Sequence, residues 1–263
     1  MDSDAAAGGL AAGLDDLLGA EDGLVPTRLA DTVLARLAGA IAAGRLKPGD
    51  PMPSEGRIAA GFGVSKQIAR EAIRELAALG VIHVQQGKTS RVQAVSGAPL
   101  GRLFRFAVGD GIEGLTQAVE LRRILEPGIA ALAAERRSAA DVETLKQILA
   151  RMEAALGVPA RWIEADLDFH RAIARISGNR LIELQLEALE PVIRRMMERF
   201  NHRHRRTLAD WRQTFARHER VARAIERGGA NGGARRAAEA MTAHFADAPL
   251  ALSELAEDRS ETT

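Results

Sequence analysis

The amino-acid sequence predicts a mainly α-helical protein in two parts: a small N-terminal domain of three helices and a β-hairpin, then a larger antiparallel bundle of about seven helices. Three observations support this prediction. Apolar residues recur every three or four positions through most of the 263 residues. Strand-like alternation occurs at residues 81–95, and a Ser-Gly-Ala-Pro linker at residues 96–99 follows it. Residues 1–24, rich in Ala, Gly and Asp, are expected to form a disordered tail.

The N-terminal domain, residues 25–95, is expected to begin with two helices. Thr27 can cap the first helix, which runs to about Ala43. A turn at residues 47–50 and an extended Pro-Met-Pro segment then separate it from a short second helix, which Ser54 can cap.

The third helix, residues 64–79, carries the clearest functional signal. Ser65 can accept a hydrogen bond from a free N–H group of its first turn. Lys66, Arg70 and Arg74 recur along one face, and a helix with such a basic row fits the major groove of DNA, which is about 12 Å wide. The alternative is an ordinary surface helix, whose two interleaved glutamates pair with these cations. The other face is apolar and must be buried; it consists of Ile68, Ala69, Ala72, Ile73, Leu76 and Ala77.

A β-hairpin follows, because apolar and polar residues alternate on both sides of Gly87, where the chain must reverse. Three helices and a hairpin form a winged helix-turn-helix, in which Gly87 and Lys88 lie at the wing tip, near phosphate or the minor groove of DNA. Residues 25–96 hold ten Lys and Arg against five Asp and Glu, whereas residues 1–24 hold six acidic residues and no cation. Positive charge is therefore concentrated in the domain that carries the basic helix.

The C-terminal domain is expected over residues 100–250, with a frayed tail at residues 251–263. Pro127 is expected to kink the second helix of this domain or to reset its start, and Asn179 is expected to cap the fifth. A Gly-rich segment at residues 228–233 would be a flexible loop. The expected helices span about residues 99–108, 112–134, 138–155, 159–176, 179–200, 206–227 and 234–246.

The composition excludes several classes of protein. The chain contains no Cys, which rules out disulfides and thiolate metal sites and suits a reducing cytoplasm. Tyr is absent and other aromatic residues are few, so base stacking on single-stranded nucleic acid is not expected. No run of about 18 apolar residues exists, and the start lacks the basic segment of a signal peptide. We therefore expect a cytoplasmic protein without a membrane partner.

Six short motifs of the N-terminal domain follow one another in a characteristic order: Leu46-Lys47-Pro48-Gly49-Asp50, Pro53-Ser54-Glu55, Phe62-Gly63-Val64-Ser65, Arg70-Glu71-Ala72-Ile73, Gly80-Val81-Ile82 and Gln86-Gly87-Lys88. In these motifs the sequence resembles the GntR family of transcription regulators over about 70 residues. The resemblance implies a winged helix-turn-helix that binds double-stranded operator DNA.

The same resemblance implies which residues contact DNA. Ser65, Lys66 and Arg70 match the family's positions on the recognition helix, and Gln86 and Gly87 match its wing. Two positions depart from the pattern. Many members have a DNA-contacting Arg directly after the Ser-Glu pair, whereas this chain has Gly56 there and Arg57 one residue later. The family commonly has Arg in place of Lys66, and because Lys cannot make the planar bidentate contact to guanine, specificity is expected to depend more on Arg70.

Five motifs of the C-terminal domain also match one family: Glu120-Leu121-Arg122 with Glu126, Asp166 with Phe169-His170, Ser177-Gly178-Asn179, His218-Glu219, and Ala240-Met241 with His244. They resemble the ligand-binding domain of the FadR subfamily, the FCD domain, which is an antiparallel helical bundle. The seven expected helices fit the larger variant of this domain.

A divalent metal site is expected in this domain. Asp166 and His170 are four residues apart and share a helix face, while His218 and His244 lie on two later helices. One carboxylate and three imidazoles suit zinc, which we prefer, or nickel, manganese or iron. The spacing alone would also fit hydrogen-bonded core histidines, but the resemblance places these four residues at the family's metal positions. His202 and His204 are interpreted as a solvated basic turn rather than a second metal pair, and His83 as structural.

Arg122 is the candidate that binds the carboxylate of an effector, because a guanidinium inside a helical bundle needs an anionic partner. A salt bridge with Glu120 or Glu126 is the alternative. Asn179 is either a further effector-binding residue or only a helix cap. The resemblance implies that the effector is a small organic acid or sugar acid at the metal.

The leading functional hypothesis is a DNA-binding transcriptional regulator rather than an enzyme. We expect a repressor that binds an inverted-repeat operator as a homodimer and responds to the acid effector. One alternative is a metal-dependent hydrolase that uses the His and Asp site to activate water. A second alternative is a regulator without metal that responds to a long acyl-CoA.

Overall fold

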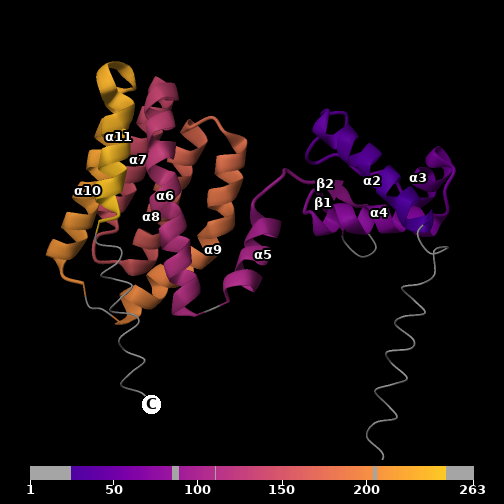
Figure 1. The fold of residues 1–263 in the computed structure, drawn as a ribbon, viewed down its shortest axis with the longest axis horizontal. Coiled ribbons are helices and arrows are strands. Elements are labelled where there is room, and N and C mark those ends of the chain that lie inside the picture. The colour runs from indigo at the N-terminus through magenta and orange to yellow at the C-terminus, as the bar shows by residue number, and fades with distance from the viewer. Residues whose placement is uncertain (1–24, 85–88, 110, 204–205, 247–263) are drawn as a thin grey trace, which may run out of the picture. The chain divides into compact units, whose positions relative to one another are not determined.

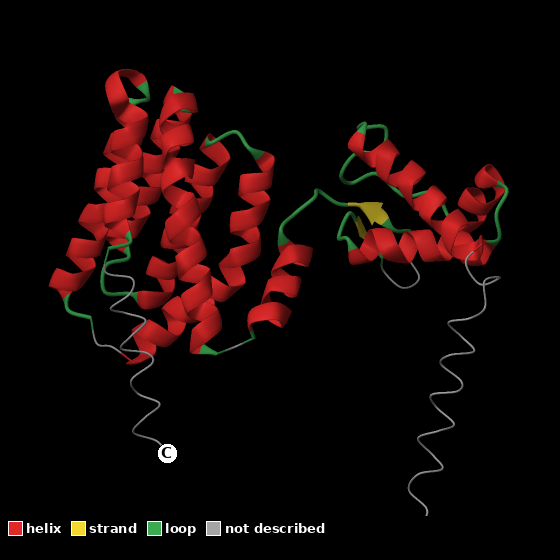
Figure 2. Ribbon diagram, viewed as in Figure 1, coloured by secondary structure: helices red, strands yellow, loops and turns green. Residues whose placement is uncertain are grey.

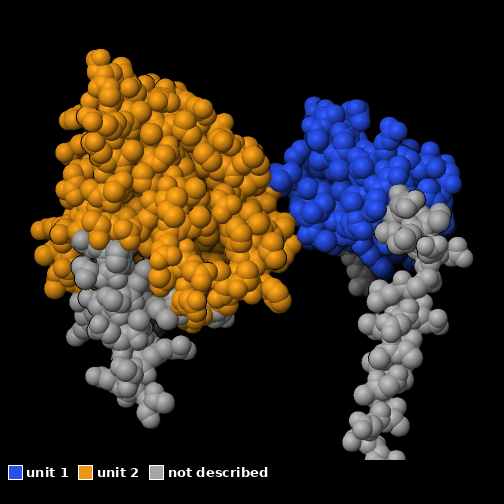
Figure 3. All heavy atoms as spheres, in the orientation of Figure 1, with its two compact units in different colours: residues 1–95 blue, residues 96–263 orange. Residues whose placement is uncertain are grey.

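The computed structural model describes residues 25–84, 89–109, 111–203 and 206–246. Helices dominate, and the sheet within these residues has only two strands (Figures 1 and 2). The chain separates into two compact units, Met1–Val95 and Ser96–Thr263 (Figure 3). Of the helices in the described ranges, none combines the length and the apolar character that a membrane span requires. The predicted mainly α-helical fold class is confirmed.

The elements of the N-terminal unit are α2 Val25–Ala42, α3 Glu55–Phe62, α4 Lys66–Ala78, β1 Ile82–His83 and β2 Arg91–Val92. Because α2 begins at Val25, Thr27 lies inside its first turn and is not its N-cap, contrary to the prediction. Pro26 accounts for the earlier start, since proline is well tolerated in the first turn, where a backbone N–H has no partner within the helix.

Helix α4 packs against α2 and α3 and supplies the centre of a small core. Its predicted apolar face is confirmed, because Ala69, Ala72 and Leu76 are fully buried and Ile73 nearly so. Burial of one large aliphatic side chain contributes about 1.5–3 kcal/mol, so this face fixes the orientation of the helix and turns its basic face outward. The same core contains Val33, Leu37, Met52, Ile58, Ile82 and Val92.

The two strands form the predicted hairpin, with Ile82 opposite Val92 and His83 opposite Arg91. The Pro-Met-Pro segment, predicted to be extended, adds to the other side of β2. There the Met52 N–H donates to the Ser90 carbonyl at 2.8 Å, and the Val92 N–H donates to the Asp50 carbonyl at 2.9 Å. The base of the wing is thus tied to the segment that precedes α3, a pairing that the sequence did not reveal.

The C-terminal unit contains the seven helices that the sequence predicts: α5 Ala98–Val108, α6 Ile112–Arg136, α7 Ala139–Ala154, α8 Pro159–Ile176, α9 Arg180–Arg203, α10 Leu208–Arg227 and α11 Gly233–His244. Helix α5 includes Ala98 and Pro99, which the sequence assigned to the linker, because proline is favourable in a first turn. Helix α6 continues through Pro127. The Gly-rich segment before α11 contains a short 3₁₀ turn, Ala230–Gly232.

Helix α8 is the central helix of this unit, and 11 of its 18 residues are buried. It packs against α6, α7 and α9, while α11 packs on α6 and α10 (Figure 1). Two of the buried residues are Asp166 and His170, which lie one turn apart. The face that holds the bundle together therefore also carries polar side chains into its interior.

Helix α5 approaches α9 unusually closely through two glycines. The Gly97 N–H donates to Glu187 Oε2 at 2.7 Å. At Gly101 an added Cβ atom would lie 2.9 Å from the Ala188 carbonyl oxygen, closer than real Cβ contacts come. Gly128 in α6 is the opposite case, because nothing lies within 4 Å of a Cβ atom there.

These two positions give opposite predictions for the same substitution. Gly101→Ala should destabilise the C-terminal unit by about 1–3 kcal/mol, because α5 and α9 must separate to admit the methyl group. Gly128→Ala should stabilise it by about 0.5–1 kcal/mol, because alanine loses less backbone entropy than glycine in a helix. Urea unfolding followed by circular dichroism measures both, and equal effects would contradict the close packing of α5 on α9.

Candidate nucleic-acid interface and metal centre

The exposed face of α4 carries the predicted basic row, Lys66, Arg70 and Arg74. The predicted cap is confirmed, because the Ser65 hydroxyl accepts a hydrogen bond from the Ile68 N–H at 3.2 Å. Ser54 caps α3 in the same way, through the Arg57 N–H at 3.3 Å. Both helices of the helix-turn-helix thus begin at a side-chain cap, which defines where the basic row starts.

Arg70 is held by an ion pair that crosses between the two helices. Its Nε donates to Glu55 Oε2 at 3.0 Å, and its Nη2 lies 3.0 Å from the same oxygen. The hydrogen bond that Arg70 donates to Glu55, together with the negative charge of Glu55, raises the pKa of Arg70. The partner is therefore Glu55 of α3 rather than a glutamate of α4 itself. Because Nε and one edge of the guanidinium are engaged, the Nη1 end stays directed away from Glu55.

The structure describes only some of the other residues that were predicted to contact DNA. Arg57 is exposed on α3, and Lys66 is exposed at the start of α4. A Cβ atom at Gly56 would lie 3.8 Å from Lys66 Cε, so the lysine side chain passes beside the position where many GntR members carry Arg. The wing residues Gln86, Gly87 and Lys88 lie outside the described residues, whereas His83 at the base of the wing is exposed.

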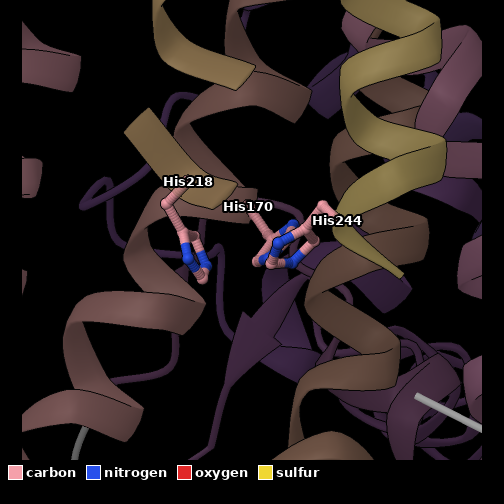
Figure 4. Close-up of side chains that lie close together, drawn as sticks. All are labelled: His170, His218 and His244. Atoms are coloured by element: carbon pink, nitrogen blue, oxygen red, sulfur yellow. The ribbon is translucent and has the colours of Figure 1, made fainter. Parts of the chain in front are cut away.

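The structure brings together three histidines that the sequence predicted as metal ligands. His170 comes from α8, His218 from α10 and His244 from the end of α11 (Figure 4). One ring nitrogen of each lies within 4.8 Å of the others. His170 and His218 are buried and His244 is partly buried, so the cluster is an interior feature of the bundle.

Asp166 completes the cluster. Its Oδ1 lies 2.9 Å from His218 Nε2, and its Oδ2 lies 3.9 Å from His170 Nε2. The other nitrogen of His218, Nδ1, lies 2.9 Å from the Thr214 carbonyl oxygen. A carbonyl only accepts, so Nδ1 carries a proton. Nε2 then either donates a second proton to the carboxylate or shares a metal ion with it.

Two further nitrogens are suited to a cation. His170 Nε2 and His244 Nδ1 are buried and have no hydrogen-bond partner within the described structure. An unsatisfied buried polar group costs about 1–3 kcal/mol, which a metal ion would relieve. Burial lowers the pKa of His244, and the charges of His218 and His170 lower it further, so its lone pair is available at neutral pH. The donor set therefore fits a divalent ion of the zinc type.

The carboxylate of Asp166 also fits that role. Burial alone would raise the pKa of this group, but the hydrogen bond with His218 and the charges of His170, His218 and Arg122 lower it well below its usual range. Asp166 is therefore ionised and acts as an acceptor. Aromatic rings surround the cluster: the Phe169 and Trp162 ring centroids lie 5.1 and 5.7 Å from that of His218. These contacts restrict rotation of the ligand side chains.

Glu126 of α6 belongs to the site, although the sequence showed it only as a salt-bridge partner for Arg122. That salt bridge is present, from Arg122 Nε to Glu126 Oε1. The second oxygen, Oε2, accepts from His170 Nδ1 at 2.5 Å. Burial raises the pKa of Glu126, but the charges of Arg122 and His170 outweigh it and lower the pKa to about 2. The four-residue spacing could reveal the first contact, but nothing local could reveal the second.

The two predicted effector-binding residues lie in different places. Arg122 is buried, with its Cζ atom 5.1 Å from the centroid of the Phe245 ring, and it lines a narrow cavity of about 20 Å³ together with Glu126 and His170. Asn179 is exposed and caps α9, because its Oδ1 accepts from the Leu181 N–H at 3.0 Å. The predicted cap is confirmed, and the structure gives no contact between Asn179 and this cavity. The His204 position and the His202 side chain lie outside what the structure describes.

Comparisons with known proteins identify both units. Residues 29–92 match the family model described as "Bacterial regulatory proteins, gntR family", and residues 117–247 match the FCD domain. A solved structure of Streptococcus agalactiae GntR superposes with a TM-score of 0.67 over 83% of this chain and 98% of that chain. At 24% identity this similarity shows the fold.

Curated relatives carry the same assignment. The chain is 29% identical over 218 residues to the HTH-type transcriptional regulator LutR of Bacillus subtilis, covering 80% of this chain and 94% of the relative. It is 30% identical over 161 residues to the HTH-type transcriptional repressor NanR of Edwardsiella tarda, covering 59% of this chain and 61% of the relative. With a gntR-type domain followed by an FCD domain, the chain belongs to the GntR family and is a DNA-binding transcriptional regulator, not an enzyme.

Proposed function

We propose that the protein is a repressor of the FadR subfamily that binds an inverted-repeat operator as a homodimer and is controlled by a small acid at a metal-containing pocket. The observation that carries this proposal is the buried cluster of Asp166 and three histidines, with two ring nitrogens that lack partners in the described structure. The name of the relative NanR, a repressor, supports the direction of regulation.

In the proposed complex α4 lies in the major groove of operator DNA. Arg70 contacts a guanine, while Lys66, Ser65 and Arg57 contact bases or phosphates nearby. The wing residues Gln86, Gly87 and Lys88 contact phosphate or the minor groove. Two-fold symmetry places two recognition helices on half-sites about 34–36 Å apart, one turn of DNA.

Arg70→Ala should weaken operator binding about 10- to 100-fold, because one bidentate contact to guanine is worth about 1–3 kcal/mol. Arg36→Ala on α2 removes the same charge from another exposed position and should change operator affinity much less. A mobility-shift titration at fixed salt measures both variants. Equal affinity for wild type and Arg70→Ala would remove α4 from the proposed interface.

In the C-terminal unit we propose that Asp166, His170, His218 and His244 hold a divalent ion, with zinc preferred over nickel, manganese or iron. When bound, such an ion supplies a positive charge to which a carboxylate can bind. The chain's own residues prepare the site: Glu126 and the Thr214 carbonyl orient His170 and His218, and the aromatic rings limit the access of water.

His170→Ala and His244→Ala should each remove most of the bound metal, because each deletes one of three imidazole donors. The matched control is His83→Ala, which deletes an exposed histidine at the base of the wing and should leave metal content unchanged. Elemental analysis of purified full-length variants gives the ratio of metal to protein. A ratio in His170→Ala equal to that of wild type would refute the metal site.

For the effector we propose a small organic acid or sugar acid whose carboxylate binds Arg122; Asn179, an exposed helix cap, has only its structural role in this proposal. The cavity beside Arg122 has room for about one water molecule, so an acid must displace side chains to enter. Binding of the acid would alter operator affinity through a coupling free energy between the two units.

A thermal-shift screen of carboxylic and sugar acids, with and without zinc, identifies the effector class. A ligand at 100 times its Kd stabilises the folded state by about 2.7 kcal/mol, so the correct acid should raise the melting temperature clearly. The increase should require zinc and should disappear in Arg122→Met. Stabilisation by a long acyl-CoA without metal would instead favour the regulator that contains no metal.

A further inference from the structure

Glu126 occupies a position that the proposed function does not explain. It is 1% exposed, and its single carboxylate contacts both the candidate effector anchor, Arg122, and the candidate metal ligand, His170. We infer that Glu126 is a positioning residue that couples the metal site to the anion site, so that occupancy of one changes the affinity of the other. This inference rests on the metal site proposed above.

The first step concerns the His170 ring. Arg122 Nε donates to one oxygen of the Glu126 carboxylate, and the other oxygen, Oε2, accepts from the N–H at His170 Nδ1. The ring nitrogen left for a metal ion is then Nε2, which faces Asp166 and has no hydrogen-bond partner in the described structure. Glu126 thus selects the tautomer and ring orientation that a metal ligand needs.

The second step concerns Arg122. Both oxygens of Glu126 are engaged, so the carboxylate divides its charge between the guanidinium and the imidazole. A guanidinium this close to the cluster also repels a metal ion. Arg122 therefore opposes metal binding in two ways, whereas Glu126 promotes it. A carboxylate ligand that attracts Arg122 would weaken the contact of Arg122 with Glu126. The Glu126 carboxylate would then interact more strongly with His170.

The third step concerns the net charge of the buried side chains around the metal site. The buried side chains of Arg122, Glu126 and Asp166 bring one cation and two anions, a net of one negative charge, to the metal site. A divalent ion converts this to one net positive charge in a medium of low dielectric constant, which favours the entry of one carboxylate. Metal and acid should therefore bind with positive cooperativity, and because coupling is reciprocal each should tighten the other.

The experiment uses full-length protein stripped of metal, with Zn²⁺ as the probe in calorimetric or chelator-competition titrations. Glu126→Gln should weaken Zn²⁺ binding about 10- to 100-fold, the usual loss when an outer partner of a metal ligand is removed. Arg122→Met should leave Zn²⁺ affinity unchanged or increase it. Glu120→Gln, which neutralises an exposed glutamate of the same helix, is the control and should bind Zn²⁺ as wild type does.

A spectroscopic measurement distinguishes a positioning role of Glu126 from a general contribution of Glu126 to the stability of the fold. Co²⁺ bound to Glu126→Gln should show an altered visible absorption spectrum, because His170 loses its fixed orientation. A merely structural role would lower the melting temperature of the metal-free protein and leave both the spectrum and the Zn²⁺ affinity unchanged.

Glu126→Gln leaves Arg122 buried without its partner and can fail to fold, so the double variant Arg122→Met/Glu126→Gln, which retains neither charge, serves as the second test. It should bind Zn²⁺ more weakly than Arg122→Met does, because both proteins lack the guanidinium and only Arg122→Met keeps the Glu126 carboxylate. Equal Zn²⁺ affinity in these two variants, or a loss in Arg122→Met as large as in Glu126→Gln, would overturn the coupling role while leaving the metal site intact. Failure of wild-type protein to bind Zn²⁺ would overturn the metal site itself.

Discussion

Burial of charge inside the helical bundle is the constraint on which the C-terminal unit depends. An unpaired buried ion costs several kcal/mol, so each charged group must meet a partner from another helix or another turn. Arg122 meets Glu126, Glu126 meets His170, and Asp166 meets His218. These contacts join α6, α8 and α10, and α11 adds His244. These polar contacts therefore restrict the packing of the four helices more than apolar contacts alone would.

The N-terminal unit also combines apolar burial with an ion pair, but here the ion pair is exposed on the surface. Its core is small, and α4 contributes four buried residues to it. Burying that face turns the basic row outward, while the Glu55–Arg70 ion pair links α3 and α4, the two helices of the helix-turn-helix. An exposed ion pair contributes little to stability, so its role is to orient the guanidinium rather than to hold the fold together.

The proposed regulation requires two sites that communicate, and the buried network of the C-terminal unit would provide a physical basis for sensing an effector. The histidine cluster and Arg122 are adjacent within one buried network, in which a single glutamate contacts both. A change in charge at either place therefore redistributes hydrogen bonds at the other. That arrangement fits the proposed acid effector better than a hydrolytic site, because each carboxylate of the described network, Glu126 and Asp166, is already engaged.

The helix periods, the apolar face of α4 and the serine caps could be predicted from the sequence, because period and cap are local properties of the chain. The set of Asp166 and three histidines needed the family resemblance as well, since their spacing alone also fits core histidines. The errors of prediction were also local: the start of α2 and the end of the linker, where proline permits a first turn earlier than expected. Which side chains become partners is visible only in the folded chain. Arg70 pairs with Glu55, 15 residues away, and His170 with Glu126, 44 residues away. Such contacts depend on how helices pack, and no periodicity within one helix encodes them.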